Sequence, residues 1–182
     1  PDPATTSSDI LDLDVAPDGA TLFVGIGGKH FNVVGAWAAG TGSRFWWHGF
    51  DATDHLDGDV QAVVYDGGKL YFGFHGGYNG NNQRRLMVAD AVTGVLDKSF
   101  QPNMNGIVGV ADLGADAGVL AAVGDFSVAS GRPLGGVALF PRLPSFVPAT
   151  CAAVLEMLDR SQIELASRRV VVVGASNVVG KP

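Results

Sequence analysis

The residues best suited to ligand chemistry lie near the carboxyl end of the chain. Residues 170–173 are four consecutive valines, and such an apolar, β-branched run predicts a strand buried on both faces, as in a parallel sheet. The glycine-containing turn after it can offer backbone N–H groups to a phosphate at the start of a helix. We therefore predict a nucleotide-binding strand–turn unit, whose helix would follow Pro182. Its candidate cofactor-binding residues are Gly174, Ser176, Gly180 and Lys181.

Histidines and acidic residues elsewhere form no predicted catalytic or metal set. The histidines are well separated in sequence, which favours surface or loop positions over a zinc site, and they are His30, His48, His55 and His75. Asp54, Asp57 and Asp59 would suit calcium, but the full calcium-loop spacing and a bidentate Glu are missing, so a solvated turn is predicted. No Ser-His-Asp arrangement or carboxylate pair is found, and the chain alone is expected to be non-catalytic.

Two further stretches have the composition of a binding surface. Residues 76–83 are polar and rich in glycine, so they could hydrogen-bond a sugar or form a long hairpin loop. Trp46 and Trp47 are adjacent, so in a strand they would face opposite ways. An exposed tryptophan would mark a binding surface, and the alternative is a tryptophan that packs on a neighbouring part of the fold.

The last forty or so residues resemble a known enzyme family. Four pieces occur in the order and spacing of the bifunctional methylenetetrahydrofolate dehydrogenase/cyclohydrolase family, and they are residues 146–151, 154–158, 163–168 and 170–182. That family has a Pro-Cys-Thr-Pro turn, a helix, a surface loop, and then a strand leading into a glycine-containing turn. The resemblance implies an NADP-binding segment and a parent enzyme of one-carbon folate metabolism.

This segment departs from the family pattern at several positions. Ala149, Cys151 and Ser167 stand where the family has Cys, Pro and Gly. Ala175 stands where the family has the Arg that would reach the cofactor phosphate, so weak NADP binding is expected. The family's catalytic amino-terminal domain has no counterpart in residues 1–142. The resemblance therefore covers a segment, and no catalytic residue is assigned.

A different pattern, short apolar strands in three repeats, fills the rest of the chain. The stretch at residues 9–13 recurs at 59–63 and at 106–110, offsets of about fifty and about forty-seven residues, within the range for propeller blades. The repeats are predicted over residues 9–58, 59–105 and 106–141. Hairpin turns are predicted at residues 17–19, 66–68 and 93–94. The leucines predicted to hold equivalent, inward-facing positions are Leu22, Leu70 and Leu120.

The predicted fold is therefore mainly β, with three propeller-like antiparallel β-meander repeats followed by a short αβ, incomplete Rossmann-like segment. The repeats resemble those of β-propellers in large secreted bacterial proteins, a likeness carried by Gly124-Asp125-Phe126 and by closing aromatic residues. An unclosed sandwich or meander is the alternative. Prolines predict a linker over 142–149, between the β region 1–141 and a truncated folate dehydrogenase-like segment 150–182 that begins with a helix.

Composition excludes several classes of partner. The chain has 182 residues, a formal net charge of −6 and a single cysteine, Cys151, which excludes an internal disulfide. Because nucleic-acid contacts need a clustered basic surface, no nucleic-acid partner is predicted. No apolar run reaches the length of a membrane span, so no membrane partner is predicted either.

Two functions remain open. In the first, the chain is a composite whose repeats form a non-catalytic propeller-type scaffold or binding module, with a protein or carbohydrate partner, or with oligomerisation through open blade edges. In the second, it is a fragment of an NADP-dependent methylenetetrahydrofolate dehydrogenase/methenyltetrahydrofolate cyclohydrolase. The first function would place the protein outside the cell, and the second would place it in the cytoplasm.

Overall fold

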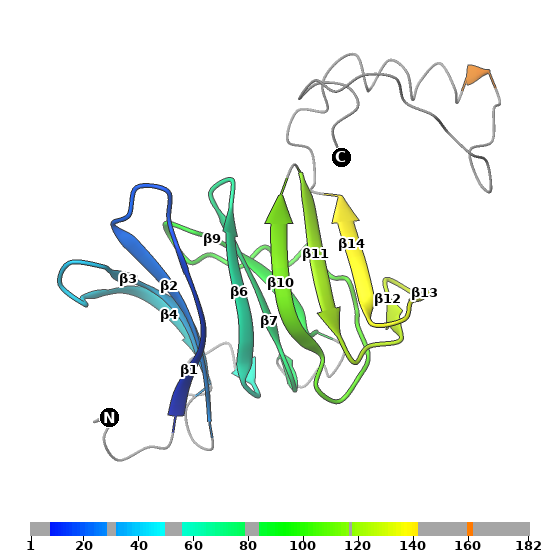
Figure 1. The fold of residues 1–182 in the computed structure, drawn as a ribbon, viewed down its shortest axis with the longest axis horizontal. Coiled ribbons are helices and arrows are strands. Elements are labelled where there is room, and N and C mark those ends of the chain that lie inside the picture. Colours follow the sequence, from blue (N-terminus) through cyan, green and yellow to red (C-terminus); the bar gives the residue numbers. More distant parts are fainter. Residues whose placement is uncertain are drawn as a thin grey trace. The chain divides into compact units, whose positions relative to one another are not determined.

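The structure is a computed structural model, and it describes residues 8–28, 32–49, 56–78, 84–116, 118–141 and 160–161. The chain divides into two compact units, Pro1–Phe140 and Pro141–Pro182. The first unit is built from antiparallel β-strands (Figure 1). The predicted linker and valine strand lie outside the described residues, as does the predicted helix apart from its last two positions. In the described part of the chain, no helix is long and apolar enough to cross a membrane.

Three antiparallel sheets, numbered here in chain order, make up most of the first unit. Sheet 1 has the order β1-β2-β3-β4, and its strands are Ser8–Val15, Thr21–Gly28, Val33–Ala38 and Arg44–Gly49. Sheet 2 has the order β6-β7-β9, and its strands are Val60–Asp66, Lys69–Phe74 and Leu86–Asp90. Sheet 3 has the order β10-β11-β14, and its strands are Val110–Asp116, Val119–Gly124 and Val137–Pro141.

Two short strand pairs complete the described structure. Strand β5 (Leu56–Asp57) pairs with β8 (Gly77–Tyr78), and β12 (Val128–Ala129) pairs with β13 (Arg132–Pro133). The first of these pairs connects to sheet 2, and the second lies in the connection between β11 and β14. Neither pair was predicted, because two-residue strands have no periodic pattern to recognise.

The first two strands pair in the same register in all three sheets. A β-bulge interrupts each pair at the same place, and the bulges fall at Ile10/Asp12, Val60/Ala62 and Val110/Asp112, fifty residues apart. The partners of Leu22, Leu70 and Leu120 are Val15, Tyr65 and Ala115, so the three leucines hold equivalent register positions. Glycines with positive φ close the predicted hairpin turns, including Gly19 (φ 68°) and Gly68 (φ 83°).

The third repeat starts later than the sequence pattern predicts. Residues 106–110 were matched to 59–63, but β10 begins only at Val110. Gly106 and Gly109 have φ angles of 108° and 73°, which belong to a turn and not to a strand. The predicted offset of about forty-seven residues is therefore wrong, and the register gives fifty.

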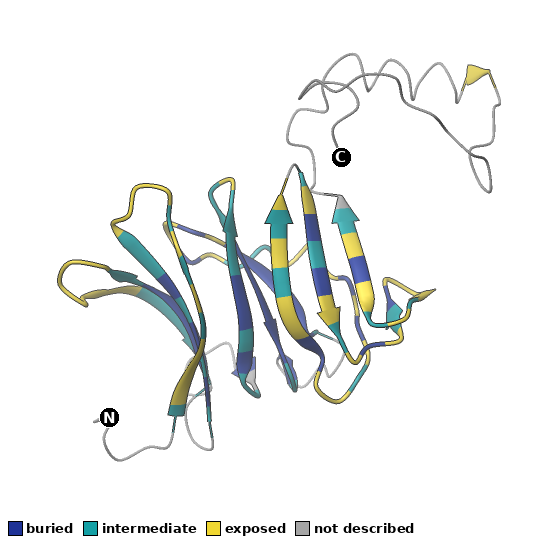
Figure 2. Ribbon diagram, in the orientation of Figure 1, coloured by how far each residue is buried: buried dark blue, intermediate teal, exposed yellow. Residues whose placement is uncertain are grey.

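Sheet 2 packs between sheets 1 and 3, and both of its faces are buried (Figure 2). Because successive residues of a strand point to opposite faces, Leu70 and Phe72 meet sheet 1, whereas Tyr71 meets sheet 3. The first strands of the three sheets, β1, β6 and β10, run side by side (Figure 1).

The equivalent leucines differ in burial. Leu70 and Leu120 are buried, each facing the sheet that precedes its own, whereas Leu22 is half-buried because no preceding sheet is among the described residues. The predicted inward-facing position is thus confirmed for two leucines and wrong for Leu22. The described residues show three stacked sheets without closure into a propeller.

Candidate functional site

The predicted cofactor-binding residues Gly174, Ser176, Gly180 and Lys181 lie outside the described residues, together with the valine strand before them. Their role in NADP binding therefore stays a prediction. The described residues offer a second candidate, a pocket of about 390 Å³ between β4 and the turn that follows β9. The pocket is lined by Trp46, Trp47, His48, Thr93, Gly94, Val95, Leu96 and Lys98.

Strand β4 forms one wall of this pocket because two of its side chains reach sheet 2. Trp46 lies opposite Ala36 on the face toward sheet 2, and its indole Nε1 donates a hydrogen bond to the Ala91 carbonyl oxygen at 3.0 Å. Nε2 of His48 lies 2.6 Å from the Gly94 carbonyl oxygen. Because a carbonyl oxygen only accepts, Nε2 carries the hydrogen in this contact. Of the two alternatives for the tryptophan pair, Trp46 follows the one in which it packs on a neighbouring part of the fold.

The opposite wall is a tight turn that depends on a glycine. Gly94 has a φ of 74°, and a Cβ atom placed on it would lie 2.6 Å from the Trp46 ring. The Asp90 carboxylate holds the turn by accepting hydrogen bonds from the backbone N–H groups of Val92 and Thr93 and from the Thr93 hydroxyl. The Thr93 backbone and side-chain hydrogen bonds lower the pKa of Asp90. The pocket therefore has preformed walls.

Two cationic side chains lie at the pocket, Lys98 in its lining and Arg44 over the Trp47 ring. The Arg44 guanidinium lies 5.1 Å from the centre of the Trp47 ring, close enough for a cation–π interaction. Asp97, between the lining residues Leu96 and Lys98 in the chain, forms an ion pair with Lys69 at 3.5 Å. Hydrogen bonds from Ser99 lower the pKa of Asp97. The lining suits binding of a small ring-bearing molecule.

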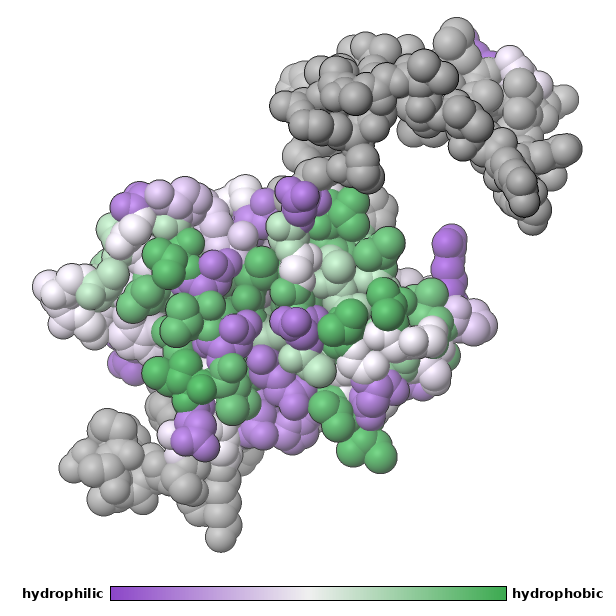
Figure 3. Space-filling view, in the orientation of Figure 1, coloured by the Kyte–Doolittle hydropathy of each residue, from purple (hydrophilic) through white to green (hydrophobic). Residues whose placement is uncertain are grey.

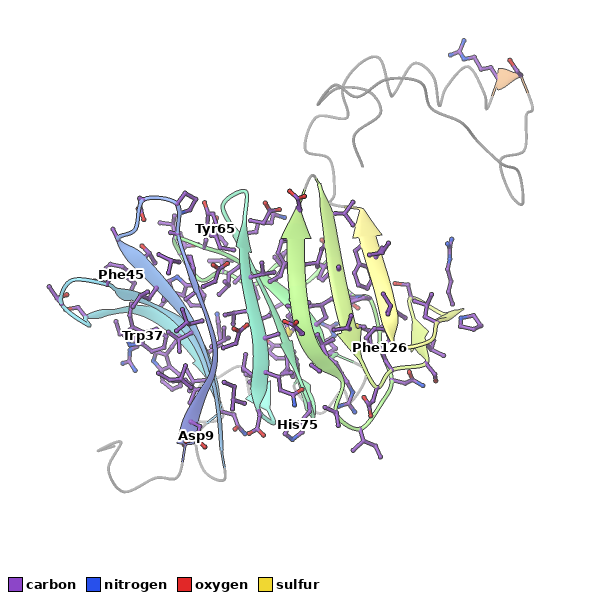
Figure 4. All side chains as sticks on the ribbon, in the orientation of Figure 1. Asp9, Trp37, Phe45, Tyr65, His75 and Phe126 are labelled. Carbon is purple, nitrogen blue, oxygen red and sulfur yellow. The ribbon has the colours of Figure 1, made fainter. Side chains whose placement is uncertain are left out.

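Two of the predicted histidine and aspartate candidates, His75 and Asp59, form contacts within the β-strand unit. His75 Nδ1 lies 3.5 Å from Asp59 Oδ2, and the other carboxylate oxygen of Asp59 accepts a 2.7 Å hydrogen bond from the Gly28 backbone N–H. This second contact connects sheet 1 to the start of β6. Figure 4 shows His75 and Tyr65 at opposite ends of sheet 2. His30, His55 and Asp54 lie outside the described residues, within which no group of three metal-ligating side chains occurs.

The Gly124-Asp125-Phe126 motif holds the loop at residues 106–109 in place through hydrogen bonds to the Asp125 carboxylate. Asp125 Oδ2 accepts hydrogen bonds from the backbone N–H groups of Ile107 and Val108, and Oδ1 accepts one from Gly109. These hydrogen bonds, that of Val108 first, lower the pKa of Asp125, and the guanidinium of Arg85 adds to the effect. Phe126 is buried in the core between sheets 2 and 3.

The sequence analysis identified both parts of the pocket wall but did not predict that they lie next to each other. The tryptophan pair and the turn at residues 93–94 each stood out by composition, yet they are far apart in the chain. Their meeting follows from the stacking of sheet 1 on sheet 2. A signal was present in Gly94 itself, since a glycine in a turn can permit close approach of an aromatic ring.

Comparison with known proteins points to the carboxyl-terminal segment. Residues 148–182 match the family model described as tetrahydrofolate dehydrogenase/cyclohydrolase, NAD(P)-binding domain. This match falls on the same segment as the ordered family motif.

Relatives with curated names are similar to parts of the chain. The bifunctional protein FolD 1 of Saccharopolyspora erythraea is 43% identical over 103 residues, which cover 52% of this chain and 35% of that protein. The bifunctional protein FolD of Parafrankia sp. is 40% identical over 100 residues, covering 51% of this chain and 36% of that protein. The bifunctional protein FolD 1 of Frankia casuarinae is 55% identical over 49 residues, which cover 27% of this chain and 17% of that protein. The chain thus spans about a third or less of the length of these relatives.

Proposed function

We propose that the chain carries a fragment of a bifunctional methylenetetrahydrofolate dehydrogenase/methenyltetrahydrofolate cyclohydrolase, with NADP as the cofactor of the parent enzyme. The supporting observation is the match of residues 148–182 to an NAD(P)-binding domain, together with identities of 40–43% to FolD proteins over about half of this chain. Of the two locations considered above, we accordingly propose the cytoplasm.

The donor set of the glycine-containing turn fits a phosphate in part. Gly174 and Gly180 would offer backbone N–H groups, Ser176 a hydroxyl, and Lys181 an ammonium group. When bound, NADP supplies the hydride chemistry, while the chain's own residues bind and orient its phosphate. Ala175 lacks the planar guanidinium of the family's Arg, so we propose weak, millimolar binding, which corresponds to about 4 kcal/mol.

For the β-strand unit we propose a second, non-catalytic role as a propeller-like scaffold or binding module. The specific observation in its favour is the shared register of the three sheets, with a bulge at the same position in each. The aromatic pocket beside β4 would be its ligand site, with a carbohydrate as the ligand class. None of the relatives described above is named as a propeller protein, so this role rests on the strand pairing.

A calorimetric titration of the whole chain with NADP tests the cofactor proposal. We expect millimolar binding by the unmodified chain and at least roughly tenfold tighter binding by Ala175→Arg, because the variant restores a charged phosphate donor. A Ser176→Ala variant serves as the matched control within the same turn and should bind more weakly than the unmodified chain. Micromolar binding by the unmodified chain would contradict the assigned effect of Ala175. No binding by any of these chains up to about 10 mM would remove the cofactor proposal.

A further inference from the structure

Two apolar sheet faces of the β-strand unit have no other described element packed against them. The sheet 1 outer face, on β1 and β2, consists of Ile10, Leu13, Val15, Leu22, Val24 and Ile26. The sheet 3 outer face, on β11 and β14, consists of Val119, Ala121, Val123, Val137 and Leu139. In Figure 3, hydrophobic residues gather over β1 and, separately, over β11 and β14, with hydrophilic residues between them. Contiguous apolar surface of this kind marks an interaction site.

The sheet 1 outer face corresponds to a face that is buried in the other two sheets. Ile10, Leu13 and Val15 of β1 are the register equivalents of Val60, Val63 and Tyr65 of β6, which pack against sheet 1. In sheet 3 the equivalents are Val110, Leu113 and Ala115, which pack against sheet 2. Ile10 and Leu13, by contrast, are 64% and 56% exposed. The side chains on this face are thus of the type that receives a preceding sheet.

The sheet 3 outer face corresponds to the face that each earlier sheet presents to the next. On sheet 1 this face holds Phe23, whose ring stacks on Tyr65 of sheet 2 at 5.5 Å, and Asp12, whose Oδ2 accepts a hydrogen bond from the Val63 backbone N–H. Asp112 is the register equivalent of Asp12 and accepts the same local hydrogen bond, from the next residue's N–H. On β14 of the same sheet, Val137 and Leu139 are 53% and 65% exposed.

We propose that the occupant of each face is a second copy of this chain, with the sheet 3 outer face of one copy stacked on the sheet 1 outer face of the other. This contact repeats the stacking of sheet 1 on sheet 2 and of sheet 2 on sheet 3. The two faces that would meet are the register equivalents of the faces that already pack against each other within one chain. The contact is heterologous, since each copy contributes a different face. Two copies joined twice in this way would contain six sheets, within the four to eight of known propellers.

Light scattering on the full chain, over about 1 to 100 μM, measures the proposed dimer. Ile10→Lys/Leu13→Lys places two charges on the sheet 1 outer face, and Val137→Lys/Leu139→Lys does the same on the sheet 3 outer face. We expect each double variant to raise the dissociation constant at least roughly tenfold, because the ammonium groups would have to be desolvated in the contact. The matched control, Val92→Lys/Ile107→Lys, changes two exposed apolar residues on neither face and should leave association unchanged.

Mixing the variants distinguishes a heterologous contact from a symmetric one. The sheet 1 variant keeps an intact sheet 3 face and the sheet 3 variant keeps an intact sheet 1 face, so a mixture should form dimers that neither variant forms alone. Thermal unfolding of each variant, expected to match that of the unmodified chain, verifies the fold. A monomeric unmodified chain at 100 μM, which would mean that another part of the protein or a different partner covers the faces, overturns the proposal. A dissociation constant that either double variant leaves unchanged overturns it as well.

Discussion

Sheet 2 and its two neighbours are built on one register, yet they differ in how much of their surface is covered. Leu70, Phe72 and Phe74 of sheet 2 are fully buried, whereas Leu22, Val24 and Ile26 of sheet 1 are only half-buried. The strand pattern is apolar in both cases. The comparison teaches that the position of a sheet in the stack, and not its own sequence, decides how much stability its apolar residues contribute.

The largest difference is expected between two equivalent leucines. Leu70→Ala should lower the free energy of unfolding by about 2–5 kcal/mol, because it opens a cavity in the core between sheets 1 and 2. Leu22→Ala, at the same register position, should cost only about 1 kcal/mol. Urea unfolding at a protein concentration that keeps the chain monomeric provides the measurement. Equal costs for the two variants would show that the sheet 1 outer face is covered within one chain.

Two glycines with similar backbone angles should separate the packed junction of sheets 1 and 2 from the exposed end of sheet 1. Gly94→Ala should cost about 2–4 kcal/mol, since it combines a positive φ with a clash against the Trp46 ring. Gly42 has a φ of 68° and open space around it, so Gly42→Ala should cost only about 1 kcal/mol. The difference between the two melting curves isolates the clash. A Gly94→Ala variant as stable as Gly42→Ala would show that the turn can move away from the ring.

The equivalent aspartates test the hydrogen bonds between sheets. Asp12→Ala should cost about 1–2 kcal/mol, because the Val63 N–H of sheet 2 loses its charged acceptor at 2.8 Å. Asp112→Ala should cost about 0.5 kcal/mol or less, since Asp112 is exposed and bonds only within β10 among the described contacts. Chemical denaturation of both variants at pH 7 decides the matter. A larger stability loss for Asp112→Ala than for Asp12→Ala would mean that the exposed aspartate of sheet 3 contributes more to the free energy of unfolding than the aspartate that bonds sheet 1 to sheet 2.

The smallest expected effect concerns the acid sensitivity of the loop before sheet 3. The pKa of Asp125 is lower in the folded protein than in the unfolded chain, so its stabilising contribution is complete above the ordinary aspartate pKa of about 4 and disappears as the pH falls through the lowered value. Asp125→Asn should therefore be less stable than the unmodified chain at pH 7. The gap should narrow below about pH 4. A gap that stays constant down to pH 2 would rule out this role of the carboxylate.

The sequence predicted the β-strand unit well at the level of single hairpins. Turns at residues 17–19 and 66–68 and the apolar strands after them were found because glycine and alternating apolar residues are local signals. The predicted start of β10 was wrong. The hydrogen bonds that keep residues 106–109 out of the strand come from Asp125, which follows β11 and is therefore distant in the sequence. The propeller interpretation also assumed that the sheets close into a ring. Hairpin signals act within one sheet and therefore do not determine how separate sheets are arranged.

The candidate sites divide in the same way. The glycine-containing turn at residues 174–180 was recognised from its own motif, and the match of residues 148–182 to an NAD(P)-binding domain supports that segment. The pocket beside β4 was not foreseen, because Trp46 and Gly94 become neighbours only when two sheets stack.

By itself, then, the sequence determined which stretches form strands, where they turn and which segment resembles a folate enzyme, because these properties depend on neighbouring residues in the chain. Only the tertiary structure decided which of three equivalent faces are buried, which aspartates connect sheets, and where Trp46 meets the turn at Gly94. The physical reason is that burial depends on two surfaces that meet. Leu22 and Leu70 have the same side chain and register, and among the described residues only Leu70 has a sheet packed against it.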